Sequence, residues 1–214
     1  MLIEFSIVYR YLVDLGKPPR GVLHLGAHEC EEKEVYNQHG IPDTKIVWVD
    51  GNEHLVERMK ARGVPNLYHA LVDETERDVN FYITNNGQSS SILEMGTHKD
   101  LYTNITVVET RQQRTTTLEK LVEDNKIDMS NLNFWNFDIQ GAELLALKGA
   151  TQLLKYADAL YLEVNTEEVY KNCAKLHELD SFLASHGFQR VAISMYKNLN
   201  PTDDGWGDAL WVRF

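Results

Sequence analysis

Short apolar runs alternate with amphipathic stretches along most of the chain, which is typical of an α/β protein. The apolar runs predict strands at residues 21–25, 45–50, 66–73, 104–114, 132–138, 157–165, 188–194 and 208–214. Segment 78–83 alternates apolar and polar residues, as a half-exposed strand does. Helices are predicted at residues 30–39, 53–61, 115–121, 142–149 and 175–186. Alternating strands and helices predict a mostly parallel sheet with helices on both faces.

The N-terminal stretch predicts an amphipathic helix over residues 3–15. Its apolar face is expected to carry Ile3, Ile7, Val8, Tyr11, Leu12 and Leu15. Gly16 ends this helix, and Pro18-Pro19 forbids its continuation. We expect residues 1–20 to form a helical cover at one end of the sheet, within a single domain of residues 1–214. A role for this helix in dimerisation is the weaker alternative.

The net charge of −11, without any basic run, argues against a nucleic-acid or anionic-membrane partner. No apolar run approaches the length of a membrane span, and Glu4, Arg10 and Asp14 interrupt any signal-peptide core. Cys30 and Cys173 form no CxxC pattern, which favours a reducing compartment. We therefore expect a cytoplasmic monomer or homodimer that binds a neutral or cationic small ligand.

One stretch organises the rest of the chain: an apolar strand ends in Asp138, Gly141 allows a sharp turn, and a helix follows. One face of that helix is expected to consist of Ala142, Leu145, Ala146 and Gly149, which are spaced as residues on one side of a helix are. A carboxylate at the carboxyl end of a buried strand faces the crevice where open α/β sheets bind ligands. The alternative is that Asp138 merely caps the following helix.

Two earlier strand ends point to a cofactor site. Gly26 follows the strand at residues 21–25, and Asp50 follows the next strand about one βαβ unit later. A carboxylate at this place commonly binds both hydroxyls of a ribose, although Asp50 could instead cap the helix at residues 53–61. The dinucleotide pattern GxGxxG is absent, and three glutamates between residues 29 and 32 would repel a pyrophosphate. A cationic cofactor without phosphate is thus favoured over a nicotinamide dinucleotide and an oxidoreductase function.

With these pieces placed, the chain resembles the FkbM family of S-adenosylmethionine-dependent methyltransferases. The resemblance covers about residues 21–165, and its motifs are His24–His28, Asn86–Leu93, Thr116–Glu119, Phe137–Glu143 with Leu147–Ala150, and Tyr161–Val164. The run Asp138-x-x-Gly-Ala-Glu143 followed by Leu-Lys-Gly-Ala is the most specific of them. The chain departs from the family at Leu25, where Val is usual, and at Gln140, where Glu is usual.

The resemblance implies a Rossmann-like class I methyltransferase fold, with a mostly parallel seven-stranded sheet and an antiparallel last strand at residues 208–214. It also implies S-adenosylmethionine at the carboxyl ends of the strands. By position, the methionine part would lie over Gly26, Ala27 and His28. Asp50, followed by Gly51 and Asn52, would bind the ribose. The remaining cofactor-binding positions would be Asp73 at the adenine amine, Ser90 in the polar loop and Asp138 near the amino group or the reacting methyl.

The family methylates mainly hydroxyls of sugars and related natural products, so the resemblance implies a sugar or glycan acceptor. The compact form is similar to glycan-modifying members, some of them from large algal viruses, in which case the compartment would be the host cytoplasm. Another small-molecule hydroxyl is an alternative acceptor. Because Gln140 replaces an acid, a catalytically inactive domain that binds the cofactor or a protein partner stays open as well.

A hydroxyl acceptor calls for a base or a metal ion. Asp138 and Glu163 are the candidates for direct general-base action. Alternatively, Asp138, Glu163 and Asn165 hold Mg²⁺ or Mn²⁺, which prefer such oxygen ligands; we favour the metal-independent version. His28 and His98 are further base candidates, although most histidines in folded chains are structural. Trp206 and Asp208 are candidates for stacking against and hydrogen bonding a sugar.

Overall fold

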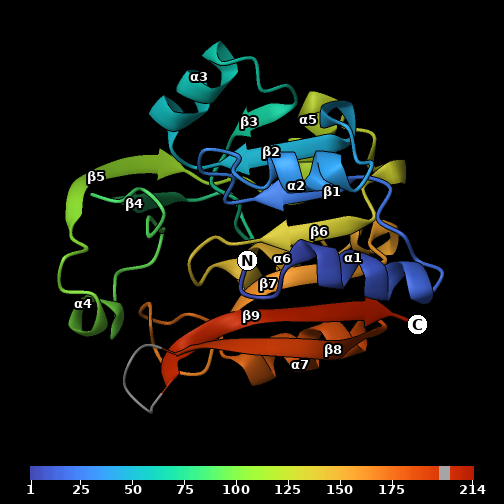
Figure 1. Ribbon diagram of the computed structural model, residues 1–214. Coiled ribbons are helices and arrows are strands. Elements are labelled where there is room, and N and C mark those ends of the chain that lie inside the picture. Colours follow the sequence, from blue (N-terminus) through green and yellow to red (C-terminus); the bar gives the residue numbers. More distant parts are fainter. Residues whose placement is uncertain (198–202) are drawn as a thin grey trace.

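The sheet predicted from the sequence is present in the computed structural model, which describes residues 1–197 and 203–214. Its strands are β1 (Val22–Leu25), β2 (Ile46–Asp50), β3 (Leu67–His69), β6 (Phe134–Phe137), β7 (Ala159–Asn165), β8 (Phe188–Lys197) and β9 (Asp203–Arg213). They lie in the order β3-β2-β1-β6-β7-β9-β8 (Figure 1). β9 runs antiparallel to β7 and β8, whereas β3, β2, β1, β6 and β7 are parallel to their neighbours. The expected mostly parallel sheet with a reversed last strand is confirmed.

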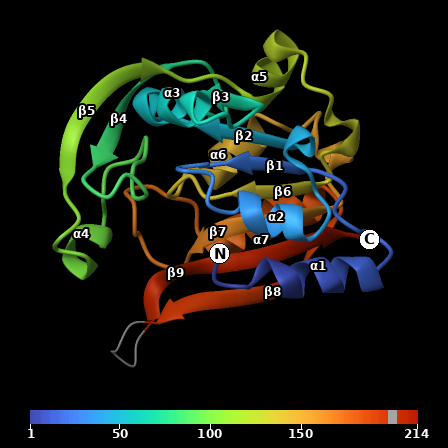
Figure 2. The ribbon, with the colours of Figure 1, turned by 45° about the horizontal axis from the view of Figure 1, so that its top comes forward.

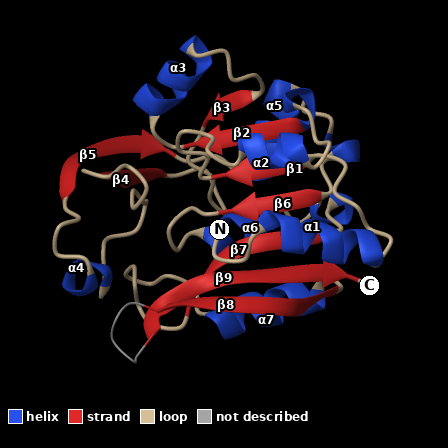
Figure 3. Cartoon of the chain, in the orientation of Figure 1, coloured by secondary structure: helices blue, strands red, loops and turns tan. Residues whose placement is uncertain are grey.

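Helices cover both faces of this sheet, as the alternating pattern predicts (Figure 3). The α-helices are α1 (Phe5–Asp14), α2 (Lys33–Gln38), α3 (Glu53–Ala61), α4 (His98–Leu101), α5 (Leu118–Asn125), α6 (Glu143–Lys148) and α7 (Leu176–Ser185), and 3₁₀ turns occupy Asp43–Lys45, Met129–Asn131 and Leu154–Tyr156. α1, α2 and α3 contribute to the apolar core on one face, and α5, α6 and α7 to the core on the other. Among the described residues, no helix has the length and apolarity that a membrane span requires.

The N-terminal helix is confirmed, and its predicted apolar face is confirmed for Val8 and Leu12 but not for Ile7, Tyr11 and Leu15. α1 buries Phe5, Val8 and Leu12 against a face of the sheet, where the ring of Phe5 meets that of Phe134 at 5.4 Å between centroids. Ile7 keeps 51% of its surface exposed, and Tyr11 and Leu15 are exposed as well. Two apolar faces overlap on this helix. The face that packs on the sheet is the one that contains the ring of Phe5.

An antiparallel pair of strands stands apart from the main sheet. β4 (Asp78–Thr84) pairs with β5 (Val107–Arg114), and both lie with α4 on the side toward which the parallel strands point (Figures 1 and 2). We call β4, β5 and α4 the arm. Val79, Phe81 and Ile83 of β4 pack on Leu71, so the half-exposed alternation predicted for this strand is confirmed. The arm thus faces the carboxyl edge of the sheet.

Two predicted boundaries need correction. β3 stops at His69, so the chain reaches Asp73 through an irregular segment rather than as strand. β9 already begins at Asp203, where a loop was predicted over residues 201–207; the first two residues of that loop lie outside the described part of the chain. β9 is longer than expected because Trp206 and Gly207 pair with Asn165 and Val164 of β7.

The loops that follow β1 and β6 cross at Gly26. A Cβ atom at this position would lie 1.7 Å from the carbonyl oxygen of Asp138, and the φ angle of +82° is one that side chains disfavour. Gly26 is therefore required twice over, by its backbone conformation and by the close approach of the Asp138 peptide.

We predict that Gly26→Ala lowers the free energy of unfolding by about 3 kcal/mol and the Tm by roughly 10 °C, because both strain and overlap must be relieved. Gly16→Ala is the matched control: its φ is +72°, but nothing lies within 4 Å of the added carbon. That variant should lose only about 1 kcal/mol. Equal losses in thermal unfolding for the two variants would contradict the crossing argument.

Candidate active site

Two cavities adjoin at the carboxyl edge of the sheet, below the arm. The first cavity has a volume of about 580 Å³ and the second about 1190 Å³, and both volumes include space that is open to solvent. Gly26, His28, Gln88 and Asp138 line both cavities. The two cavities therefore adjoin where these four residues lie, with the side chain of Asp138 facing both.

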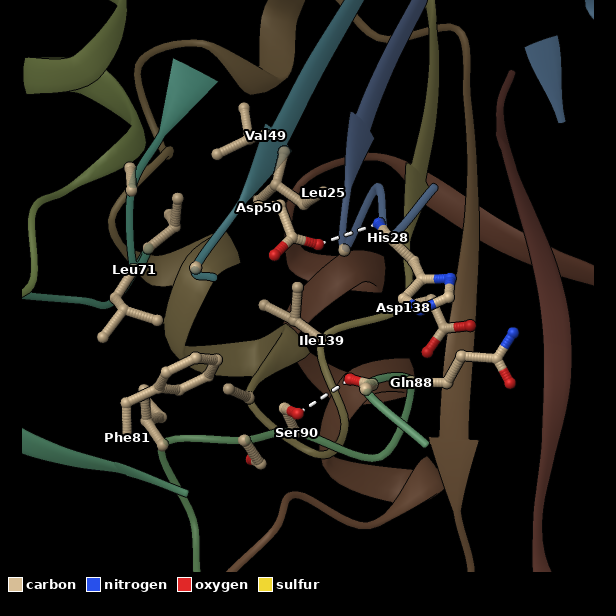
Figure 4. A pocket seen from close by; sticks show the side chains of 18 residues that line it. Leu25, His28, Val49, Asp50, Leu71, Phe81, Gln88, Ser90, Asp138 and Ile139 are labelled. Carbon is tan, nitrogen blue, oxygen red and sulfur yellow. Dashed lines mark hydrogen bonds between the residues drawn. The ribbon is translucent and has the colours of Figure 1, made fainter. Parts of the chain in front are cut away.

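The first cavity has an apolar wall and a polar wall. Leu71, Phe81 and Ile139 lie together at one end, and His28, Gln88 and Asp138 lie at the other (Figure 4). Phe81 comes from the arm, whereas Ile139 comes from the loop after β6. An apolar slot between two such elements suits the faces of a flat heterocycle.

Asp50 lies between these walls and is held by the backbone. Its Oδ2 accepts a hydrogen bond from the His28 amide at 2.8 Å, and its Oδ1 accepts one from the Asn52 amide at 2.7 Å (Figure 4). Burial raises the pKa of the Asp50 carboxyl. Each carboxylate oxygen retains a free lone pair, so the pair of oxygens can still accept two hydroxyls. The helix-capping role falls to Asn52, whose side-chain oxygen accepts from the Leu55 amide at the start of α3.

The loop from Thr84 to Ser91 closes the first cavity from the arm side. Ser90 and Ser91 line the cavity; the Ser90 hydroxyl donates to the carbonyl of Gly87 at 2.7 Å, and that of Ser91 donates to the carbonyl of Gln140 at 2.8 Å. The polar loop is thus tied to the turn after β6. Gly51 lines the cavity too, where a Cβ would meet Leu71 at 2.2 Å, whereas Ala27 lies buried beneath it.

Asp73, predicted at the adenine amine, is not among the described residues that line either cavity. Its buried carboxylate accepts a hydrogen bond from Arg77 Nε at 2.7 Å and another from the Glu74 amide. The neighbouring residues Ala70, Leu71 and Val72 line the cavity in its place. The adenine role of Asp73 stays a prediction that this arrangement does not favour.

The second cavity contains a pair of carboxylates joined by an amide. Nε2 of Gln140 donates to Oδ1 of Asp138 and, at 2.8 Å, to Oε2 of Glu163. The Tyr170 hydroxyl donates to Oε1 of Gln140 at 2.6 Å, which fixes the orientation of the amide. Burial, followed by the neighbouring Asp138 carboxylate, raises the pKa of Glu163 well above its usual range. Glu163 therefore holds its proton more tightly than a free carboxyl does, while Asp138 lies at the surface of the cavity.

The turn between Asp138 and α6 is held by a second buried carboxyl. Oε1 of Glu143 accepts from the amides of Ile139 at 2.9 Å and Gly141 at 3.2 Å. Gln140 and Gly141 both have positive φ angles, so the turn is tight and its amides point inward. Burial raises the pKa of Glu143 to about 8.

Aromatic side chains form the outer wall of the second cavity. The ring of Trp206 stacks on Tyr196 at 4.6 Å between centroids, and its Nε1 donates to the Tyr102 hydroxyl at 2.9 Å. Asp208 accepts hydrogen bonds from the Tyr161 hydroxyl and the Leu2 amide, so its carboxylate is already engaged. His98 also lines the cavity, and burial lowers the pKa of its imidazole.

His28 is engaged with Glu31, since its Nδ1 lies 2.6 Å from Oε1 of that side chain. This hydrogen bond is the main reason why the pKa of His28 is raised, so the imidazole is more readily protonated than a free one. Because Glu31 already occupies Nδ1, His28 is a poorer base candidate than the open carboxylate of Asp138.

The metal site of Asp138, Glu163 and Asn165 stays a prediction that the arrangement of the described residues does not favour. Asn165 is buried beside Lys175 and does not line the cavity that holds Asp138 and Glu163. The amide nitrogen of Gln140 lies between the two carboxylates, and an N–H donor cannot be a metal ligand. Among the described residues, no three His, Cys, Asp or Glu side chains gather as a metal would require.

Several residues of the site were not predicted. Gln88 was inside a recognised motif but was not singled out, and the alternation of β4 could have placed Phe81 on a buried face. Leu71 and Tyr170 carry no signal in the sequence, because their roles depend on segments that are distant along the chain.

Known proteins are similar to this chain at the level of a family profile and of the fold. The profile of the methyltransferase FkbM domain matches residues 26–190. A solved structure of WbdD with a kinase inhibitor is similar, with a TM-score of 0.52 and 12% identity over 99% of this chain and 40% of that chain. Magnesium protoporphyrin IX methyltransferase from Synechocystis PCC 6803 with bound SAM matches with a TM-score of 0.49 and 14% identity, over 98% and 77% of the two chains. No curated protein sequence matches the chain.

We predict that Glu143→Gln changes the pH dependence of stability. The pKa of Glu143 is about 8 in the folded protein against an ordinary 4.5, so the unfolded chain loses this proton first as the pH rises. The contribution of Glu143 to the free energy of unfolding therefore falls between pH 4.5 and pH 8. Glutamine keeps the acceptor oxygen but does not titrate, so the Tm of the variant should gain on the wild type across this range.

Glu178→Gln is the control for this measurement, because Glu178 also accepts a backbone hydrogen bond at a helix start but is exposed. Thermal unfolding is followed from pH 5 to pH 8.5. A Tm difference between Glu143→Gln and the wild type that does not change with pH would contradict the buried, protonated state of Glu143.

Proposed function

The chain belongs to the FkbM methyltransferase family, and from that premise we propose that it transfers the methyl group of S-adenosylmethionine to a hydroxyl of a sugar or glycan. The observation that carries the proposal is the junction of the two cavities at Asp138. A cofactor in the first cavity can present its methyl group there to an acceptor in the second. The cytoplasm stays the proposed compartment, since Cys30 and Cys173 are both unpaired.

The first cavity suits S-adenosylmethionine in its shape and in its polar groups. The apolar slot at Leu71, Phe81 and Ile139 fits the adenine ring, and Asp50 fits the ribose hydroxyls. The methionine end would lie toward Gly26 and His28, beside Asp138. When bound, S-adenosylmethionine supplies an electrophilic methyl group on a positively charged sulfur.

Asp138 is the proposed general base. During in-line transfer the acceptor oxygen bonds to the methyl carbon, the carbon–sulfur bond breaks with its electrons going to sulfur, and the hydroxyl proton leaves. The Asp138 carboxylate lies at the boundary and can accept that proton. Gln140 orients this carboxylate, and Gln140 also donates to Glu163, whose pKa is raised by burial and by the neighbouring Asp138 carboxylate. We therefore favour direct base action over a metal ion.

The acceptor proposal rests on the polar and aromatic lining of the second cavity. Asn86, Gln88 and Asn136 offer neutral hydrogen-bonding groups, and Trp206 offers an aromatic face. Sugars are recognised by this combination of directed polar contacts and an aromatic surface. A different small-molecule hydroxyl would be the acceptor if no sugar is methylated but turnover occurs.

We predict that calorimetry shows micromolar binding of S-adenosylmethionine and none of NAD, because the acidic turn after β1 repels phosphate. Asp50→Ala should weaken the binding of S-adenosylmethionine by roughly 30-fold, since two hydrogen bonds of about 1 kcal/mol each are lost. Asp78→Ala, a change at an exposed carboxylate outside both cavities, is the control. An unchanged affinity of Asp50→Ala would refute the ribose assignment.

We predict that Asp138→Asn lowers the kcat of methyl transfer to a sugar acceptor by about 10²- to 10⁴-fold, because the base is lost. The affinity for S-adenosylmethionine should change little, and Asp124→Asn on α5 serves as the control. Assays with Mg²⁺, Mn²⁺ and EDTA should give the same rate. Near-normal turnover of Asp138→Asn would contradict the proposed general-base role. If the wild type binds the cofactor but methylates no acceptor, an inactive binding domain is favoured instead.

A further inference from the structure

Among the described residues, the second cavity is lined by several acids and by no Lys or Arg. Its acidic side chains are those of Glu31, Glu32, Asp138, Glu163 and Asp208, and no described Lys or Arg lines the first cavity either. His24 and His98 do not compensate, since burial lowers the pKa of each imidazole. His28 also lines the cavity and its pKa is raised, but its Nδ1 is already paired with Oε1 of Glu31 at 2.6 Å. The described lining therefore offers no Lys or Arg side chain and no unpaired imidazolium with which to bind a phosphate.

The described backbone amides at the helix starts and turns of this edge are engaged as well. Amides at a helix start or in a tight turn commonly bind phosphate. Here the amides of Ile139 and Gly141 before α6 donate to Glu143. The amide of Glu29, in the turn before α2, donates to Oε2 of Glu31 at 3.1 Å.

The same holds at the ends of β1 and β2, where the amides of His28 and Asn52 donate to Asp50. Every one of these anion-binding positions is thus occupied by a carboxylate of the chain itself. A phosphate that entered would have to displace a carboxylate from its amide, and it would then face that carboxylate without a counter-ion. Buried charges without a partner are strongly disfavoured.

We propose that the acceptor is an uncharged sugar residue that carries no phosphate, so that nucleotide-linked and phosphorylated sugars are rejected. The proposal rests on the proposed sugar O-methylation and names the class of sugar that the second cavity takes. It also places the reaction in a sequence. A glycosyl transfer, which forms the glycosidic bond and releases the nucleotide, must precede the methylation.

The test compares matched acceptors that differ only in the carrier. Methyl glycosides of common hexoses and 6-deoxyhexoses are assayed beside the corresponding nucleoside diphosphate sugars, with S-adenosylmethionine and the full chain. We expect kcat/KM for at least one glycoside to exceed that of its nucleotide-linked counterpart by 100-fold or more. UDP and TDP at 10 mM should leave the glycoside reaction unaffected.

The two failures are distinguishable. Comparable or faster methylation of a nucleoside diphosphate sugar would overturn the inference and leave the proposed function standing. If S-adenosylmethionine binds but no sugar of either class is methylated, the proposed function itself is wrong, and the inference falls with it.

A charge reversal tests the physical cause. Glu32→Lys places a cation on the cavity wall, and UDP should then inhibit the glycoside reaction with an apparent inhibition constant at least tenfold lower than in the wild type. Glu34→Lys makes the same change at an exposed position that lines neither cavity. Ile105→Lys, on the arm side of the cavity, is a second variant should Glu32→Lys fail to fold. Equal inhibition of Glu32→Lys and Glu34→Lys by UDP would contradict the inference.

Discussion

The crossing of the peptide at Asp138 over Gly26 is the contact on which the site depends. It brings the ends of β1 and β6 closer than any side chain would allow, and Asp138 then lines both cavities. The turn that follows is held from below by Glu143 and from the side by Ser91, whose hydroxyl binds the carbonyl of Gln140. The position of the proposed base is therefore set by backbone geometry, whereas its orientation is set by the Gln140 amide.

The replacement of an acid by Gln140 is consistent with this arrangement. A carboxylate at position 140 would be a third acid beside Asp138 and Glu163, and it could donate no hydrogen bond to either. The amide donates to both and is itself held by Tyr170. The departure from the family pattern thus gives the pair a neutral donor, and by itself it does not indicate a loss of activity.

The sequence predicted most of the fold, because the apolar strands and the glycines at their ends are local signals. Gly26, Asp50 and Asp138 were placed correctly at the carboxyl edge for the same reason. Asp73 was expected there too, but β3 ends four residues earlier and the chain turns its carboxylate toward Arg77.

The buried face of α1 was predicted only in part, because two apolar faces overlap on this helix and only the contact with the sheet determines which of them is buried. Leu71, Phe81 and Tyr170 meet their partners over long sequence distances, which no local pattern reports.

The packing of the arm determines where the folded protein can open locally. Its strand β4 packs on the body of the molecule through a small apolar cluster of Leu71, Val79, Phe81 and Ile83, whereas the sheet is buried between two large cores. Local opening follows the amount of apolar contact that must be broken, so amide hydrogens of β4 and β5 should exchange with solvent before those of β1, β6 and β7. The wall of the cofactor slot that contains Phe81 can therefore open while the strands that carry Asp50 and Asp138 stay intact, which gives a bulky ligand a way in without unfolding the domain.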